Sequence, residues 1–108
     1  MDKQIIEQGK GAAITAYIMG VGALIAMSMN SENKNPFASF HIRQGLGLTI
    51  LFIVIGYTIS GFWTPMIAFP FYLFMVVLWG YGFYTALTGQ MTPMPLVGKL
   101  FQKFFKNL

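Results

Sequence analysis

The strongest constraint on this chain is three long runs of residues that carry no charge, at about 11–29, 45–62 and 66–87. At about 1.5 Å per residue the first run reaches ~28 Å, close to the ~30 Å hydrocarbon core of a bilayer. Only 9% of all residues are charged, against about 25% in an ordinary soluble domain. The chain is therefore predicted to be an all-α integral membrane protein, a single membrane domain over 1–108 with three transmembrane helices.

The first run has an alternative interpretation, because an N-terminal apolar stretch can also be a cleaved signal peptide. Its length and the acids Asp2 and Glu7 in the polar lead favour a membrane span. Small residues recur along it, and small residues on one stripe let helix backbones approach closely in lipid. We expect helix packing through Ala12, Ala16, Gly20 and Ala23.

Amphipathic segments precede the second run and close the chain. Asn35 and Pro36 are typical of an N-cap and a first helical residue, and 36–44 (PFASFHIRQ) is predicted to lie at the membrane interface. Gly89, Pro93 and Pro95 end the third run. The segment 96–108 then predicts a basic amphipathic helix on the membrane surface, with a lysine face (Lys99, Lys103, Lys106) opposite an apolar face (Phe101, Phe104, Phe105). Docking of this tail onto a partner or onto the chain's own helices is the alternative.

Few residues could carry chemistry. The chain has one histidine, one arginine, no cysteine and no acid after Glu32, which excludes paired carboxylates, a Ser-His-Asp triad and a metal site with several ligands from one chain. We expect a non-enzymatic protein with no catalytic, cofactor or metal site.

One dense polar cluster remains, made by His41, Arg43 and Gln44 beside Phe40. Polar groups that enter a bilayer usually have a partner or a task. The cluster is a candidate contact site for a partner or a lipid headgroup, and structural anchoring is the alternative. His41 and Arg43 point about 160° apart on a helix, since each residue turns by about 100°, so they are expected to contact different neighbours.

The segment NPFASFHIRQGLGL and the tail GQMTPMPLVGKLFQKFF resemble small bacterial membrane proteins related to the twenty-kilodalton component of the chloroplast inner-envelope import machinery, the Tic family. The family signature falls on Phe40, His41, Arg43, Gln44, Pro95, Gly98 and Phe101. Plastid members are channel-forming or scaffold subunits of a protein-import translocon and have four helices, whereas this sequence predicts three. The resemblance implies a role in protein translocation and supplies no catalytic residue.

These features predict a small inner-membrane protein, a subunit or scaffold in protein translocation or membrane-protein assembly, with a membrane-protein partner or further copies of itself. The alternatives are an oligomeric ion or solute channel and a lipid-surface-binding organiser. The basic residues flank apolar runs, which favours anionic headgroups over nucleic acid. With three spans, the distribution of Lys and Arg predicts the N-terminus outside and the C-terminus in the cytoplasm.

Overall fold

The computed structural model describes residues 3–18, 22–32, 34–62 and 64–106. Its elements are helical throughout this part of the chain. They are α1 (Lys3–Thr15), α2 (Gly22–Met29), α3 (Pro36–Ile59), the 3-10 turn η1 (Ser60–Phe62), α4 (Pro65–Leu87) and α5 (Gly98–Phe104). The molecule is elongated, with extents of 46 × 22 × 21 Å.

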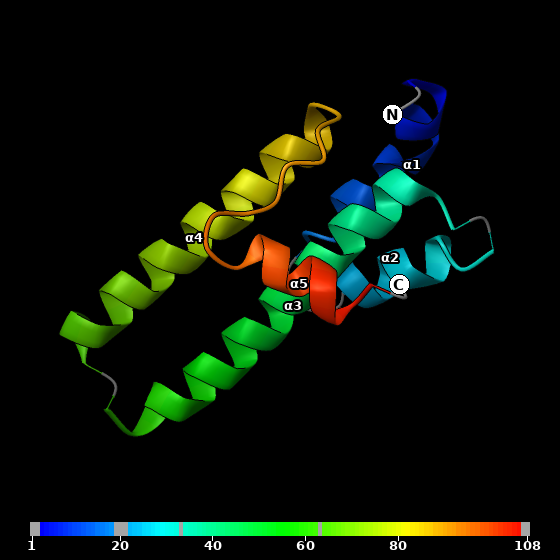
Figure 1. The fold of residues 1–108 in the computed structure, drawn as a ribbon. Helices are drawn as coiled ribbons and strands as arrows, with labels where there is room; N and C mark the ends of the chain where they lie inside the picture. The colour runs from blue at the N-terminus through cyan, green and yellow to red at the C-terminus, as the bar shows by residue number, and fades with distance from the viewer. Residues whose placement is uncertain (1–2, 19–21, 33, 63, 107–108) are drawn as a thin grey trace.

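The long helices α3 and α4 form an antiparallel pair joined through η1 (Figure 1). Asn35 caps α3 by accepting a hydrogen bond from the Ala38 amide, and a proline opens each of the two helices. Proline suits this position because the first helical residue needs no amide hydrogen bond. The predicted second and third helices are thus confirmed as elements, and both are long and apolar enough to cross a membrane.

The predicted first span over 11–29 is wrong as one continuous helix. α1 ends at Thr15, and the amides of Tyr17 and Ile18 bond back by three residues in a tightened last turn. The Tyr17 carbonyl accepts a hydrogen bond from Trp79 Nε1 at 2.6 Å. Gly22, the first residue of α2, lies beside the end of α1, because a methyl group on it would be 2.5 Å from the Thr15 carbonyl oxygen. A tertiary contact has replaced helix continuation, and apolar composition alone does not distinguish one long helix from two short ones.

The predicted interfacial segment 36–44 is helical. It is the first part of α3, continuous with the apolar part of that helix. Its residues from Phe37 to Ile42 are all buried. The segment is amphipathic in sequence, but other helices cover both of its faces.

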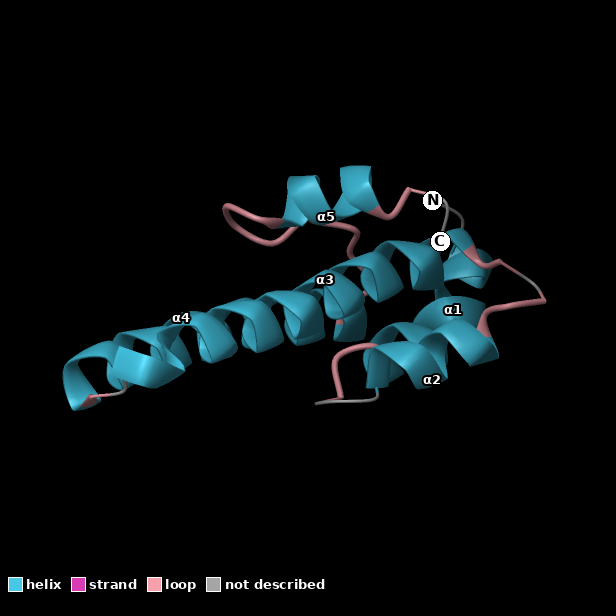
Figure 2. Cartoon of the chain, turned by 90° about the horizontal axis from the view of Figure 1, so that it is seen from below, coloured by secondary structure: helices cyan, strands magenta, loops and turns pink. Residues whose placement is uncertain are grey.

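The first half of α3 is surrounded by the other helices of the protein. Figure 2 shows α5 on one side of α3 and both α1 and α2 on the other, and Leu78 and Ala86 of α4 belong to the buried core that these helices share. We call this compact end, made of α1, α2, residues 36–47, the loop 88–97 and α5, the head. The rest of α3, together with η1 and the first part of α4, we call the hairpin.

The hairpin exposes large apolar side chains on both of its helices. Its two helices contact each other through Phe52, whose ring stacks on Phe71 at a centroid distance of 5.6 Å. Most other apolar residues have no covering layer, among them Ile50, Ile53, Val54, Met66, Phe69, Leu73, Val76 and Val77. Contiguous apolar surface of this extent is typical of a membrane or protein contact.

Two leucines of α4 provide a matched test of this packing. Leu78 is 1% exposed and Leu73 is 54% exposed. We expect Leu78→Ala to lower the free energy of unfolding by about 2–5 kcal/mol, because it leaves a cavity in the core. Leu73→Ala removes the same atoms from the outer surface and should have a much smaller effect. Thermal unfolding in detergent measures both, and equal shifts in the midpoint would contradict the packing.

Candidate functional site

The only histidine lies at the centre of the head. His41 Nδ1 is 2.6 Å from the Tyr17 hydroxyl oxygen, and His41 Nε2 is 2.7 Å from the Gln90 carbonyl oxygen. α3 supplies His41, α1 leads into Tyr17, and Gln90 belongs to the loop after α4. One side chain therefore connects three parts of the chain that are distant in sequence.

The partners fix the direction of each hydrogen bond. A carbonyl oxygen only accepts, so His41 Nε2 carries the proton and Nδ1 accepts from the Tyr17 hydroxyl. Tyr17 in turn accepts from Gln44 Nε2 at 2.8 Å, and Gln44 Oε1 accepts from the Met94 amide at 2.7 Å. The chain of bonds begins at Met94 and ends at Gln90, so both of its ends lie on the loop 88–97.

We call Tyr17, His41 and Gln44 the polar triad. All three side chains are buried, and His41 and Gln44 are 0% exposed. Burial raises the pKa of the Tyr17 phenol well above its usual range, although the hydrogen bond from Gln44 acts in the opposite direction. The hydroxyl therefore keeps the proton that it donates to His41.

Aromatic rings enclose the imidazole. Phe37, Phe40 and Tyr17 meet His41 edge to face, at centroid distances of 4.8, 5.2 and 5.5 Å. Protonation of His41 would turn Nδ1 into a donor and leave the Tyr17 proton without this acceptor. No buried side-chain nitrogen or oxygen of the described residues lacks a hydrogen-bond partner. This closed, fully bonded arrangement connects the end of α1, α3 and the loop 88–97.

Arg43 binds a different neighbour, as its angular separation from His41 predicts. Its Nε donates to the Phe105 carbonyl at 3.1 Å, and its Nη2 donates to the Lys106 carbonyl at 3.0 Å. Its Nη1 donates to Gln102 Oε1 at 3.2 Å, and Gln102 Nε2 donates to the Phe40 carbonyl at 2.8 Å. A guanidinium satisfies the carbonyls that the last turn of a helix leaves unpaired, so Arg43 fastens the end of α5 to α3.

The tail also fits α3 sterically. The ring of Phe101 occupies the space where a side chain at position 47 would be, so that only glycine fits there. Gly98 lies just as close to α3, because a methyl group on it would be 2.8 Å from Gln44 Oε1.

The predicted apolar face of the tail is divided in the structure. Phe101 is buried and Phe105 is partly buried against α3, whereas Leu100 and Phe104 are exposed. The lysines Lys99, Lys103 and Lys106 are exposed. One side of α5 docks onto the chain's own helix α3, as the alternative interpretation of the tail predicts. The other side of α5 is exposed.

The predicted packing residues are buried in the head. Ala12 and Ala16 pack with Ala26, Ala38 and Ile42 in one apolar cluster. Ala23 is buried as well, and Gly20 lies outside the described residues.

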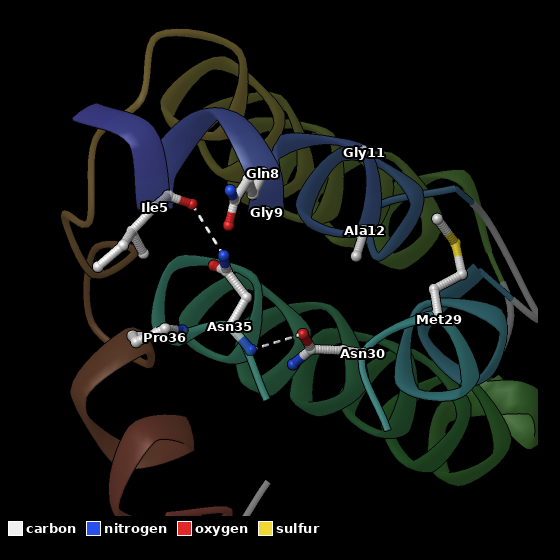
Figure 3. Close-up of a pocket in the computed structure, with 9 residues that line it drawn as sticks. All are labelled: Ile5, Gln8, Gly9, Gly11, Ala12, Met29, Asn30, Asn35 and Pro36. Carbon is white, nitrogen blue, oxygen red and sulfur yellow. Dashed lines mark hydrogen bonds between the residues drawn. The ribbon is translucent and has the colours of Figure 1, made fainter. Parts of the chain in front are cut away.

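A cavity of about 340 Å³ lies between α1, α2 and the start of α3 (Figure 3). Asn35 Nδ2 donates to the Ile5 carbonyl at 2.8 Å, and the Asn35 amide donates to Asn30 Oδ1 at 2.8 Å. Asn30 Nδ2 donates to Ser39 Oγ at 2.9 Å. The asparagines at the cavity wall thus hold the three helices together. Among the described residues no group of three or more His, Asp or Glu could hold a metal ion.

The sequence analysis did not identify Tyr17, Trp79 or the backbone of 88–97 as parts of this site. One signal was present, since a tyrosine hydroxyl within an apolar run needs a hydrogen-bond partner when buried. Nothing local in the sequence identified that partner.

No protein-family model, no curated protein and no solved structure matches this chain.

Removal of one hydroxyl tests the polar triad. Tyr17→Phe leaves His41 Nδ1 and Gln44 Nε2 without their shared partner, which should cost about 1–3 kcal/mol for each buried group left unsatisfied. Tyr57→Phe is the matched control, because Tyr57 is 83% exposed. We expect a lower unfolding midpoint in detergent for Tyr17→Phe alone. A Tyr17→Phe protein as stable as the control would contradict the hydrogen-bond chain.

Gly47→Leu tests the docking of the tail. The new side chain would collide with the Phe101 ring, whereas the matched Gly80→Leu change adds its side chain in open space. α5 should leave α3 in the first variant, and trypsin should then cleave after Lys99 and Lys103 at least several times faster. Unchanged cleavage kinetics in Gly47→Leu would show that Phe101 does not hold the tail.

Proposed function

We propose that this chain is a non-enzymatic membrane subunit whose hairpin crosses the bilayer and whose head lies at one membrane surface. The observation that carries the proposal is the apolar hairpin surface around Ile53, Val54 and Phe69. No charged residue occurs between Arg43 and Lys99, so the hairpin carries no group that is costly to place in lipid.

The hydroxyl groups of the hairpin support a scaffold rather than a channel. Thr49 Oγ1 donates to the Gly45 carbonyl, Thr58 Oγ1 to the Val54 carbonyl and Ser60 Oγ to the Tyr57 carbonyl, at 2.7–2.8 Å. These groups are satisfied within their own helix. A conduction path needs polar groups that face the permeating ion.

A hairpin with two spans implies a different membrane topology from the three-span prediction. With α1 and α2 folded back beside α3 and two spans rather than three, both termini lie on one side of the membrane. All seven basic residues fall outside the uncharged stretch between Arg43 and Lys99. The excess of Lys and Arg in cytoplasmic segments then favours a cytoplasmic head, in place of an external N-terminus. The membrane is proposed to be the bacterial inner membrane, on the resemblance to the Tic-related proteins.

The partner class also follows from the resemblance. We assign the chain a supporting role in protein translocation or membrane-protein assembly. An exposed hairpin surface would contact another membrane protein or another copy of the chain.

Topology can be mapped cleanly because the chain has no cysteine. We expect single cysteines at Lys3, Lys34 and Lys99 to react with an impermeant maleimide from one side of the membrane. A cysteine at Ser60 should react only from the other side. Reaction of the Lys3 position from the Ser60 side would restore a three-span topology, and reaction of all four from one side would refute a crossing hairpin.

Mild-detergent extraction of a tagged chain from its native membrane, followed by native sizing and mass spectrometry, tests the subunit role. The expected result is a stoichiometric complex with a membrane protein of a translocase or insertase. A monomer without partners would contradict the proposal.

A further inference from the structure

The outward side of α5 combines basic and apolar residues in adjacent stripes. Lys99 and Lys103 are four residues apart and share one stripe of the helix, while Leu100 and Phe104 share the next. Phe104 is 73% exposed although it is a large aromatic residue. Phe101, which points to α3, already provides the packing that docks the helix, so the outward stripes are not needed for docking.

The position of α5 along α3 is set by Arg43. Three hydrogen bonds from its guanidinium hold Gln102, Phe105 and Lys106 at the level of this residue. Arg43 is roughly 26 Å along the helix axis from Ser60, at about 1.5 Å per residue. That length is close to the ~30 Å hydrocarbon thickness of a bilayer, so α5 lies where the lipid headgroups begin if the tip of the hairpin reaches the opposite interface.

We infer that α5 is a membrane-surface helix that binds anionic lipid headgroups through its own Lys99 and Lys103 and through Lys106 just after it, with Leu100 and Phe104 inserted at the boundary with the acyl chains. This inference rests on the proposed function, because it requires the hairpin to be in the bilayer. It assigns a ligand, the anionic headgroup, to a face of the head that the protein itself leaves open.

Charge and continuity favour a lipid surface over an acidic protein as the occupant. The last acid in the sequence is Glu32, so the lysines of the tail have no nearby acidic residue in sequence to neutralise them. Lysine stems reach along apolar surface while the ammonium stays at headgroup level. Leu100 and Phe104 are exposed on a helix that packs against α3 through Phe101 at Gly47, where the head meets the hairpin.

The test places an environment-sensitive bimane label on Phe104→Cys in the full-length protein, reconstituted in vesicles of phosphatidylcholine with or without phosphatidylglycerol. Acrylamide, an uncharged quencher, reports access from water. We expect at least twofold weaker quenching in the anionic vesicles. Replacement of Lys99, Lys103 and Lys106 by Gln should remove this difference, since each basic residue near an anionic surface contributes roughly a fivefold change in binding.

A matched variant replaces Lys3, Lys10 and Lys34 by Gln, which removes the same charge from α1 and the loop before α3 and should leave the difference intact. Equal quenching in the two kinds of vesicle would overturn the inference. Protection of the label that survives the loss of the three tail lysines would also overturn it, because apolar packing alone would then explain the position of the helix.

A second label at Val54→Cys separates this inference from the proposed function. Protection at Val54 in both lipids, with free access of acrylamide to position 104, refutes only the lipid-binding role of α5. Access of acrylamide to position 54 shows that the hairpin is not in the bilayer, and both proposals then fall.

Discussion

His41 lies in an apolar environment where water cannot satisfy its two ring nitrogens, so the fold has to provide both partners. Each partner comes from a different part of the chain: Tyr17 from the end of α1 and the Gln90 carbonyl from the loop after α4. An unsatisfied polar group in such surroundings is expensive. The positions of the end of α1 and of the loop 88–97 on α3 are therefore specified by a directional chain of hydrogen bonds in addition to apolar contact, which tolerates many arrangements.

The starts of α3 and α4 could be predicted because the residues that determine them are local in the sequence. Asn35 and Pro36 start one helix, Pro65 starts the other, and each is followed by an apolar run of suitable length. The break after Thr15 could not be predicted, because Trp79, which binds the Tyr17 carbonyl, lies 62 residues further along the chain. The same difficulty applies to 36–44, whose two faces are covered by segments before and after it in the sequence.

The residues of the candidate site could likewise be predicted only in part. His41, Arg43 and Gln44 could be selected because polar residues stand out at the edge of an apolar run, and the different directions of His41 and Arg43 follow from helix geometry. Their partners could not be selected. Two of them are backbone groups of the loop 88–97. Because every residue has the same backbone, a sequence does not indicate which backbone groups become hydrogen-bond partners. Tyr17 could be noticed in its apolar run, but its role was ambiguous. A tyrosine in such a run can form a buried hydrogen bond or can serve as a packing residue alone.

The hydrogen-bond chain also imposes an order on biosynthesis. It joins positions 17, 41, 44, 90 and 94, so the ribosome has made most of the chain before the last acceptor exists. Until Gln90 emerges, His41 Nε2 has a proton and no designated acceptor, although the bonds of Tyr17 to His41 and Gln44 already join the end of α1 to α3. An incomplete chain thus carries two polar groups, the His41 Nε2 proton and Gln44 Oε1, without the partners that the finished fold gives them.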